Sequence, residues 1–300
     1  MAEQLCRVSD EIELCYETFG DPSNPTALLI MGLATQMIAW PDEFCEQLAA
    51  RGFHVVRFDN RDVGHSTHVK GRPPRPLELL TRSKKPARYR LEDMADDAHG
   101  LLRELDLAPA HVIGASMGGM IAQTLAARHP EDVLSLTSIM SNTGSIWTGR
   151  PAIRLYPLFL RRPTEGREAA IERTMNVFAA IGSRGLPRND DLIRDMAEQS
   201  WDRDHDPIGP GRQLAAIIAS GNRTKDLKRI KAPTLVIHGT DDRMVGVSGG
   251  RATARAIRGA KFMKVKGMGH DMPRAAWPQL IDGIVANAER AAAEPARQAA

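Results

Sequence analysis

The sequence has few cysteines, no long apolar run and almost no net charge. Its 300 residues include three cysteines, Cys6, Cys15 and Cys45, without a C-x-x-C spacing. This pattern predicts neither a disulfide framework nor a zinc site. The longest apolar run, Ala27–Ala34, has eight residues, whereas a membrane-spanning helix needs about 20. Lys and Arg total 40 against 37 for Asp and Glu, a net charge of +3, which is too even for a dedicated nucleic-acid-binding protein.

The N-terminal segment Met1–Gly20 carries five acids and one arginine and lacks the apolar core of a signal peptide. Hydrophobic residues make up 42% and charged residues 26%, an ordinary globular composition. The length suits one large domain or a domain with a sizeable insertion. We therefore expect a cytoplasmic monomer or homodimer that acts on a small molecule, with no nucleic-acid partner and no integral membrane segment.

Short apolar segments alternate with amphipathic ones at both ends of the chain, which predicts a mostly parallel sheet covered by helices on both faces. Strands are predicted at Glu11–Glu17, Ala27–Met31, His54–Phe58, His111–Ile113, Leu134–Met140, Thr234–His238 and Lys261–Lys266. Helices are predicted at Phe44–Ala50, Leu91–Leu105, Met117–His129, Gly250–Ile257 and Trp277–Ala292.

Residues 143–229 break this alternation and read as short helices at Glu165–Ala180, Asp190–Gln199 and Arg212–Ala219. We expect a core of residues 1–142 and 230–300 with a helical cap of residues 143–229. The alanine-rich end, Ala291–Ala300, is expected to be a frayed tail. Residues 69–90 hold eight basic residues and three prolines in Arg72–Pro76 and are expected to form a solvated loop.

The most informative motif is Gly114-x-Ser116-x-Gly118, which lies between a predicted strand and a predicted helix. A nucleophile on a tight strand-to-helix turn needs small residues two before and two after it, so that the backbones can pass each other. The helix N-terminus also favours developing negative charge. Ser116 is therefore the candidate nucleophile.

A serine hydroxyl needs a base, which is itself oriented by an acid. In this type of site both follow the serine in the chain. Asp241 and Asp242 come directly after the strand Thr234–His238, and His270 follows the strand Lys261–Lys266. Both positions are loops at the carboxyl ends of parallel strands, where open α/β sheets build their sites.

With these motifs, spread from about Leu28 to His270, the chain resembles the α/β-hydrolase fold family. The resemblance implies an eight-stranded sheet with the cap inserted after strand 6. It makes Ser116 the nucleophile and His270 the base, and the acid-loop pattern Asp242–Val245 favours Asp242 over Asp241. The segments Trp40–Phe44 and Phe58–Asp62 resemble a subgroup of aclacinomycin methylesterase-like enzymes and mycobacterial esterase/lipase relatives.

The oxyanion hole needs two backbone N–H groups. One is expected from Met117, which follows the nucleophile. The family supplies the second from the loop after the third strand, which here begins Met31-Gly32-Leu33, so Leu33 N–H is the candidate. We expect methionines near this loop to shape an apolar acyl pocket, whose candidate residues are Met31, Gly32, Met37 and Met120.

The sequence thus predicts a serine hydrolase that cleaves small to medium carboxylic esters, including methyl esters, with no metal or cofactor. The same three side chains also serve C–C bond hydrolases, lactonases, amidases and cofactor-free haloperoxidases. A ligand receptor built on this scaffold is the alternative from another class.

Overall fold

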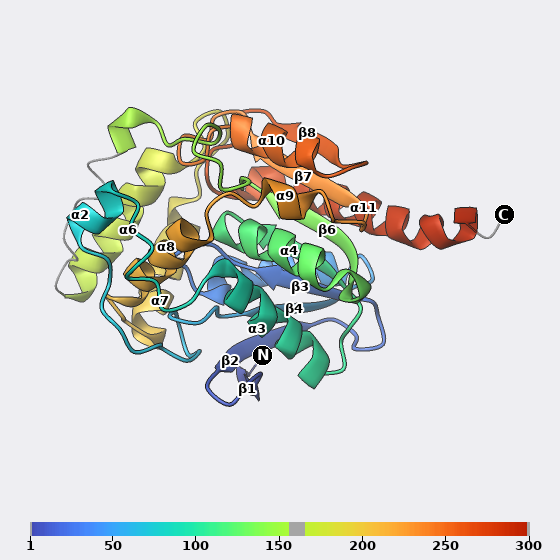
Figure 1. Cartoon of the computed structure of the whole chain (residues 1–300), viewed down its shortest axis with the longest axis horizontal. Helices are drawn as coiled ribbons and strands as arrows, with labels where there is room; N and C mark the ends of the chain where they lie inside the picture. Colours follow the sequence, from blue (N-terminus) through green and yellow to red (C-terminus); the bar gives the residue numbers. More distant parts are fainter. Residues whose placement is uncertain (1, 156–165, 299–300) are drawn as a thin grey trace.

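The computed structural model describes residues 2–155 and 166–298. These residues form an eight-stranded sheet, which runs twisted through the middle of the molecule (Figure 1). The strand order is β1-β2-β4-β3-β5-β6-β7-β8. β2 pairs antiparallel with both β1 and β4, and the remaining neighbours are parallel. The predicted mostly parallel eight-stranded sheet is confirmed. The strands are β1 Gln4–Arg7, β2 Glu13–Phe19, β3 Thr26–Ile30, β4 His54–Phe58, β5 Ala110–Ala115, β6 Val133–Ile139, β7 Thr234–Gly239 and β8 Lys261–Val265.

The central strands consist of apolar runs because helices cover both faces of the sheet. Every residue of β3, β4, β5 and β7 is buried. β1 was not predicted from the sequence, because only Cys6 of its four residues is buried and the segment carries no alternation long enough to read. All three cysteines are buried and unpaired.

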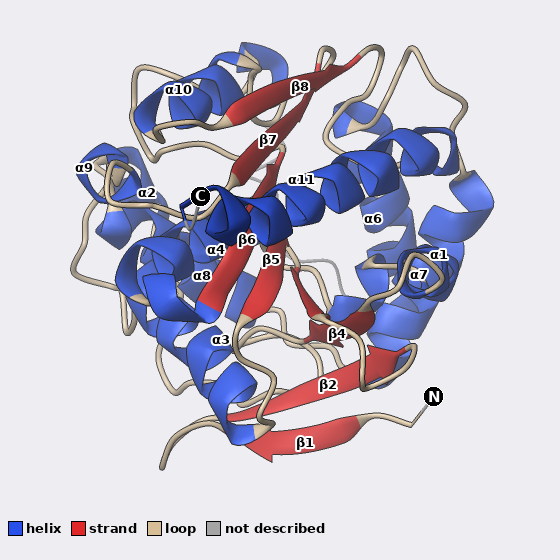
Figure 2. Ribbon diagram, turned by 90° about the vertical axis from the view of Figure 1, so that its right-hand side faces the viewer, coloured by secondary structure: helices blue, strands red, loops and turns tan. Residues whose placement is uncertain are grey.

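Two layers of helices enclose the sheet. Figure 2 shows α11 crossing one face of the sheet, with α4 on the other side. α1 packs against α11, and the apolar side chains between these two helices and the sheet form one core cluster. A second cluster lies on the other face, between the sheet and the helices α3 and α4. These helices are α1 Asp42–Ala49, α3 Leu91–Glu104, α4 Met117–Arg128, α10 Ser248–Ala256 and α11 Trp277–Gln298.

The C-terminal helix is longer than the sequence predicts. α11 continues to Gln298, and Figure 1 shows its end projecting beyond the body of the molecule. The prediction of a frayed tail from Ala291 is therefore wrong as far as Gln298. Alanine has the highest helix propensity, so the helix persists after Ala288, beyond which none of its described side chains, up to Ala293, joins the core.

A run of helices joins β6 to β7. α6 and α7 pack against each other, α8 packs on α3, and α9 packs on α4 and α10. Figure 1 shows α6, α7 and α8 gathered at one end of the molecule. Glu165, where the first of these helices was predicted to begin, lies outside the described residues. The helices are α6 Arg167–Ile181, α7 Asp190–Arg203, α8 Gly209–Ser220 and α9 Thr224–Leu227.

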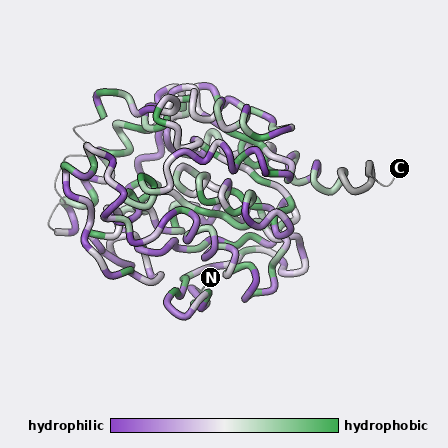
Figure 3. The backbone as a smooth tube through the Cα atoms, in the orientation of Figure 1, coloured by the Kyte–Doolittle hydropathy of each residue, from purple (hydrophilic) through white to green (hydrophobic). Residues whose placement is uncertain are grey.

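Short helices complete the chain. α2, Pro76–Leu80, interrupts the basic segment that was predicted to be a loop, and Arg72 forms an ion pair with Glu78 there, with 2.6 Å between Nη2 and Oε1. The 3-10 helices are η1 Met37–Ala39, η2 Pro130–Asp132, η3 Ile153–Leu155 and η4 Arg274–Ala276. Apolar residues are concentrated along the inner strands (Figure 3). Among the described helices, none combines the length and apolar character that crossing a bilayer requires.

Candidate active site

Ser116 occupies a strained turn between β5 and α4. Its backbone has φ 55° and ψ −117°. Residues other than glycine rarely adopt such a positive φ. A Cβ atom at Gly114 would clash with the backbone of Gly118, and one at Gly118 would clash with the carbonyl oxygen of Ile30. The two glycines of the motif are therefore required by the close passage of α4 over β3 and β5.

The structure brings Ser116, His270 and Asp242 into one hydrogen-bonded chain. His270 Nε2 lies 2.9 Å from Ser116 Oγ, and His270 Nδ1 lies 2.8 Å from Asp242 Oδ2. The three side chains come from loops at the carboxyl ends of β5, β7 and β8. Asp241, the other candidate acid, accepts a hydrogen bond from the hydroxyl of Thr240 instead.

Asp242 is held as an anion by its surroundings. One carboxylate oxygen accepts the backbone N–H groups of Met244 and Val245, at 2.9 and 2.8 Å. Burial alone would raise the pKa of Asp242, but the neighbouring His270 and His238 outweigh burial and bring the pKa down to about 2. The carboxylate can therefore accept from His270 Nδ1–H and stabilise an imidazolium that forms during a reaction.

His238 is a neighbour of the acid that the sequence did not indicate. Its Nε2 lies 2.7 Å from the carbonyl oxygen of Val245 and 3.4 Å from Asp242 Oδ2, and the side chain is fully buried. The only available signal was its position four residues before Asp242, at the end of β7. Because its Nε2–H donates to Val245, His238 fixes the loop that carries the acid.

The two candidate oxyanion donors border the nucleophile. Met117 N is the first amide of α4, and Leu33 lines the same cavity as Ser116. Within the described part of the chain, neither N–H donates to a protein acceptor. A Cβ atom at Gly32 would lie 3.1 Å from Ser116 Cβ, so the loop passes directly beside the nucleophile.

A cavity of about 570 Å³ opens over Ser116 and His270. Apolar side chains from α6 and α7 form much of its wall, and the loop after β3 also lines it. Those from the two helices are Val177, Phe178, Ile181, Leu192, Ile193 and Met196.

Only part of the predicted pocket set reaches this cavity. Met31 and Gly32 line it, but Met37 and Met120 do not. Met37 is fully buried in η1, and Met120 packs in the core cluster under α4. The prediction for these two methionines is corrected: their apolar character serves core packing.

The loop that carries His270 is bonded to the end of α6 and to the segment that follows it. His270 N donates to the carbonyl oxygen of Ile181 at 2.9 Å, and Gly269 N donates to Ser183 Oγ at 2.9 Å. Ser183 N in turn donates to Asp271 Oδ1, also at 2.9 Å. Sequence reasoning missed Ser183, because nothing local distinguishes it from a surface serine.

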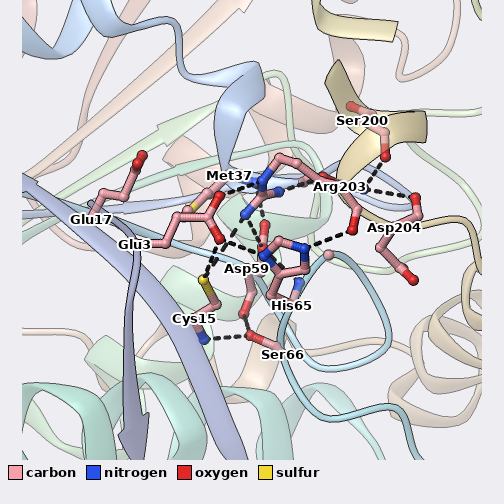
Figure 4. A network of polar contacts seen from close by, with 12 residues as sticks. Glu3, Cys15, Glu17, Met37, Asp59, His65, Ser66, Ser200, Arg203 and Asp204 are labelled. Carbon is pink, nitrogen blue, oxygen red and sulfur yellow. Dashed lines mark hydrogen bonds and ion pairs between the residues drawn. The ribbon is translucent and has the colours of Figure 1, made fainter. Parts of the chain in front are cut away.

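Among the described residues, two clusters of His, Cys and carboxylate groups lie apart from Ser116, Asp242 and His270, and in both the carboxylates bind arginine. In the first, Glu3 accepts hydrogen bonds from Arg203 at 2.7 Å and from the Cys15 thiol at 3.2 Å, beside His65 (Figure 4). The second joins Asp62, His68 and Asp206, with Arg212 donating to both carboxylates. Donors already occupy the oxygens that a metal ion would need.

Known proteins resemble the chain along most of its length. The family described as alpha/beta hydrolase fold matches residues 25–273. Rhodomycin D methylesterase DnrP of Streptomyces peucetius is 28% identical, over 94% of this chain and 97% of that protein. The non-heme chloroperoxidase CPO-A1 of Kitasatospora aureofaciens is 25% identical, over 89% and 91%. In fold, the crystal structure of the enol-lactonase from Burkholderia xenovorans LB400 matches with a TM-score of 0.74 at 24% identity, over 95% and 99%.

Proposed function

The chain belongs to the α/β-hydrolase fold family, and we propose that it is a serine hydrolase that cleaves carboxylic esters. The observation that carries this proposal is the continuous hydrogen-bonded chain from Ser116 Oγ through His270 to the buried Asp242. Its similarity to a methylesterase over nearly its whole length supports the ester as the bond that is cleaved.

In the acylation step, His270 Nε2 takes the proton from Ser116 Oγ as the oxygen attacks the acyl carbon. Asp242 keeps Nδ1 protonated and stabilises the imidazolium. The backbone N–H groups of Leu33 and Met117 donate to the oxyanion that develops on the carbonyl oxygen. Collapse of the tetrahedral intermediate breaks the ester C–O bond, and the proton on Nε2 passes to the departing alcohol.

Deacylation repeats these steps with water. His270 Nε2 removes a proton from the water molecule as its oxygen attacks the acyl carbon. The same two N–H groups stabilise the second oxyanion, and the proton then returns to Ser116 Oγ as the carboxylic acid leaves. Over the two steps, the ester and one water molecule become an alcohol and a carboxylic acid, and the three side chains return to their starting protonation states.

The cavity supports small to medium acyl esters and methyl esters as substrates. Its mostly apolar wall rewards burial of an alkyl or ring system, by about 25 cal/mol for each Å² removed from water. Its volume of about 570 Å³ lies within the range of small-molecule sites.

The decisive experiment compares Ser116→Ala with Ser141→Ala on p-nitrophenyl esters. Ser141 is buried close to the nucleophile helix, and its Oγ has no hydrogen-bond partner among the described residues. We expect Ser116→Ala to lose hydrolysis and labelling by a fluorophosphonate, while Ser141→Ala keeps both. Retention of near-wild-type turnover by Ser116→Ala would refute the proposal.

A substrate panel separates this proposal from the other activities of such a triad. Esters from acetate to octanoate and a set of methyl esters are compared with a lactone, a 1,5-diketone and peroxide-dependent halogenation. Multiple turnover with the esters as the best substrates is expected. Labelling at Ser116 with only a single turnover would instead indicate a receptor.

A further inference from the structure

A glutamine from the helical insertion, which is the run of helices α6 to α9 between β6 and β7, holds the loop that carries the candidate oxyanion donor. We propose that Gln213, on α8, is a positioning residue for the Leu33 N–H group, an inference that rests on the proposed function. Gln213 lies 180 residues from Leu33 in the chain and is fully buried.

The contacts of Gln213 bridge two loops of the sheet. Its Oε1 accepts the backbone N–H of Ala34 at 2.8 Å, and its Nε2 donates to the carbonyl oxygen of Arg61 at 2.8 Å. Arg61 lies in the loop after β4. Both polar ends of the amide are thus satisfied, which a buried glutamine requires.

The bond to Ala34 fixes the peptide unit next to the donor. Ala34 has a positive φ of 61°, a conformation that a non-glycine residue keeps only when its surroundings impose it. The carbonyl oxygen of Leu33 accepts from Thr35 Oγ1 at 2.9 Å. The two polar groups of the Leu33–Ala34 peptide unit, the carbonyl of Leu33 and the N–H of Ala34, therefore both have partners. These two bonds fix the orientation of Leu33.

The other end of the loop has a separate anchor. Met37 N donates to Asp59 Oδ1 at 2.7 Å, and Arg203 at the end of α7 donates to Asp59 Oδ2 at 2.8 Å (Figure 4). Gln36 Nε2 donates to the carbonyl oxygen of Ser200 at 2.8 Å. Without Gln213, the Met37 end would stay fixed while the Ala34 end would lose its side-chain acceptor.

This arrangement predicts a specific kinetic defect. An oxyanion donor stabilises the transition state and not the bound ester. A displacement of about 1 Å in a reacting geometry costs roughly 100-fold in rate. We expect Gln213→Met to lower kcat about 10- to 100-fold and to leave KM within about threefold of wild type.

Three variants and a transition-state analogue test the proposal. Gln213→Met removes the acceptor, whereas Gln213→Glu keeps it and, when protonated, also donates to the Arg61 carbonyl. Gln123→Met is the matched control: Gln123 is equally buried, its Nε2 donates to Ser138 Oγ at 2.9 Å and its Oε1 accepts from Arg223 Nη2 at 3.3 Å, away from the loop. An alkyl boronic acid forms a tetrahedral adduct with Ser116, and its affinity reports the oxyanion site directly.

We expect the boronic acid to bind Gln213→Met more weakly in proportion to the loss of kcat/KM, with Gln213→Glu within about fivefold of wild type. Unchanged kcat and boronate affinity in a folded Gln213→Met variant would overturn the proposal, as would an equal loss in Gln123→Met. If the Met variant does not fold, Gln213→Asn, one methylene shorter, takes its place. Wild-type turnover that depends on Ser116 is measured alongside, so failure of the proposed function is recognised separately.

Discussion

The backbone N–H of His270 donates a 2.9 Å hydrogen bond to the carbonyl oxygen of Ile181, the last residue of α6. His270, the proposed base, is thus bonded to the helical insertion, just as the loop after β3 is bonded to Gln213 on α8. The helical insertion therefore does more than line the cavity. It holds both loops that meet at Ser116, so substitutions in the insertion should change turnover as well as substrate choice.

Ser183 provides the sharpest test of this coupling. Replacing it with alanine removes the hydroxyl that accepts from Gly269 N–H and donates to Asp271 Oδ1, while the backbone bond from Ser183 N to Asp271 remains. The loss should cost about 1–3 kcal/mol in the free energy of unfolding. We expect kcat to fall about 10-fold because the His270 loop loosens. Urea unfolding and steady-state kinetics measure the two effects. A Ser183→Ala enzyme that is less stable but turns over normally would show that the bond is structural only.

The two adjacent aspartates should differ strongly in effect. Asp242→Asn removes the carboxylate that holds His270 Nδ1–H, and a change of this kind costs about 10⁴-fold in kcat. Asp241→Asn alters a side chain bonded to Thr240 and should stay within about threefold of wild type. Single-turnover acylation rates distinguish the variants, and a larger loss at Asp241 would contradict the assignment.

The turn at Ser116 should not tolerate a methyl group on the following helix. Gly118→Ala places Cβ against the carbonyl of Ile30, which belongs to the central strand and cannot move aside, so a loss of about 3 kcal/mol in unfolding free energy is expected. Gly246→Ala is the control, because its added Cβ meets its nearest atom at 3.4 Å. Its stability should change by less than about 0.5 kcal/mol. Comparable losses in both variants would speak against the close approach.

Stability should decline on acidification partly through His111. Burial lowers the pKa of His111 to about 4, below its ordinary 6.5. Between these pH values the unfolded chain binds a proton that the folded protein excludes, so the free energy of unfolding falls as pH drops from 6.5 to 4, by about 3 kcal/mol at the acid end. His111→Gln should flatten this dependence. Urea titrations across that range give the difference, and parallel curves for the two proteins would argue against it.

Much of the fold follows from patterns that are local in the sequence. Apolar runs such as Ala27–Met31, where the structure has β3 at Thr26–Ile30, identified the central strands because burial on both faces leaves no alternation to misread. Two elements were not predicted: Gln4–Arg7 has one buried residue, and Pro76–Leu80 is a helix of only five residues in a basic, proline-rich segment. The tail was misjudged because alanine helicity needs no core contact.

For the site, the sequence indicated the residues that belong to motifs. It did not indicate their hydrogen-bond partners that lie outside any motif. Ser116, Asp242 and His270 follow strand ends, and the structure brings their side chains into contact. Ser183 and Gln213 act through hydrogen bonds to backbone atoms far away in the chain. Such contacts depend on how the insertion packs, and no spacing in the sequence encodes it. Likewise, the presence of a methionine does not show whether its side chain lines the cavity, as Met31 does, or is buried away from the cavity, as Met37 is.

The burial of all three cysteines makes the chain well suited to site-directed labelling. Burial raises the pKa of Cys6 and of Cys15 and brings that of Cys45 to about 12. Since the thiolate is the form that reacts with maleimides, the native thiols should stay silent under mild conditions. One cysteine introduced on the solvent side of α7 would then carry a fluorophore that reports what enters beside it, without removing any natural residue elsewhere.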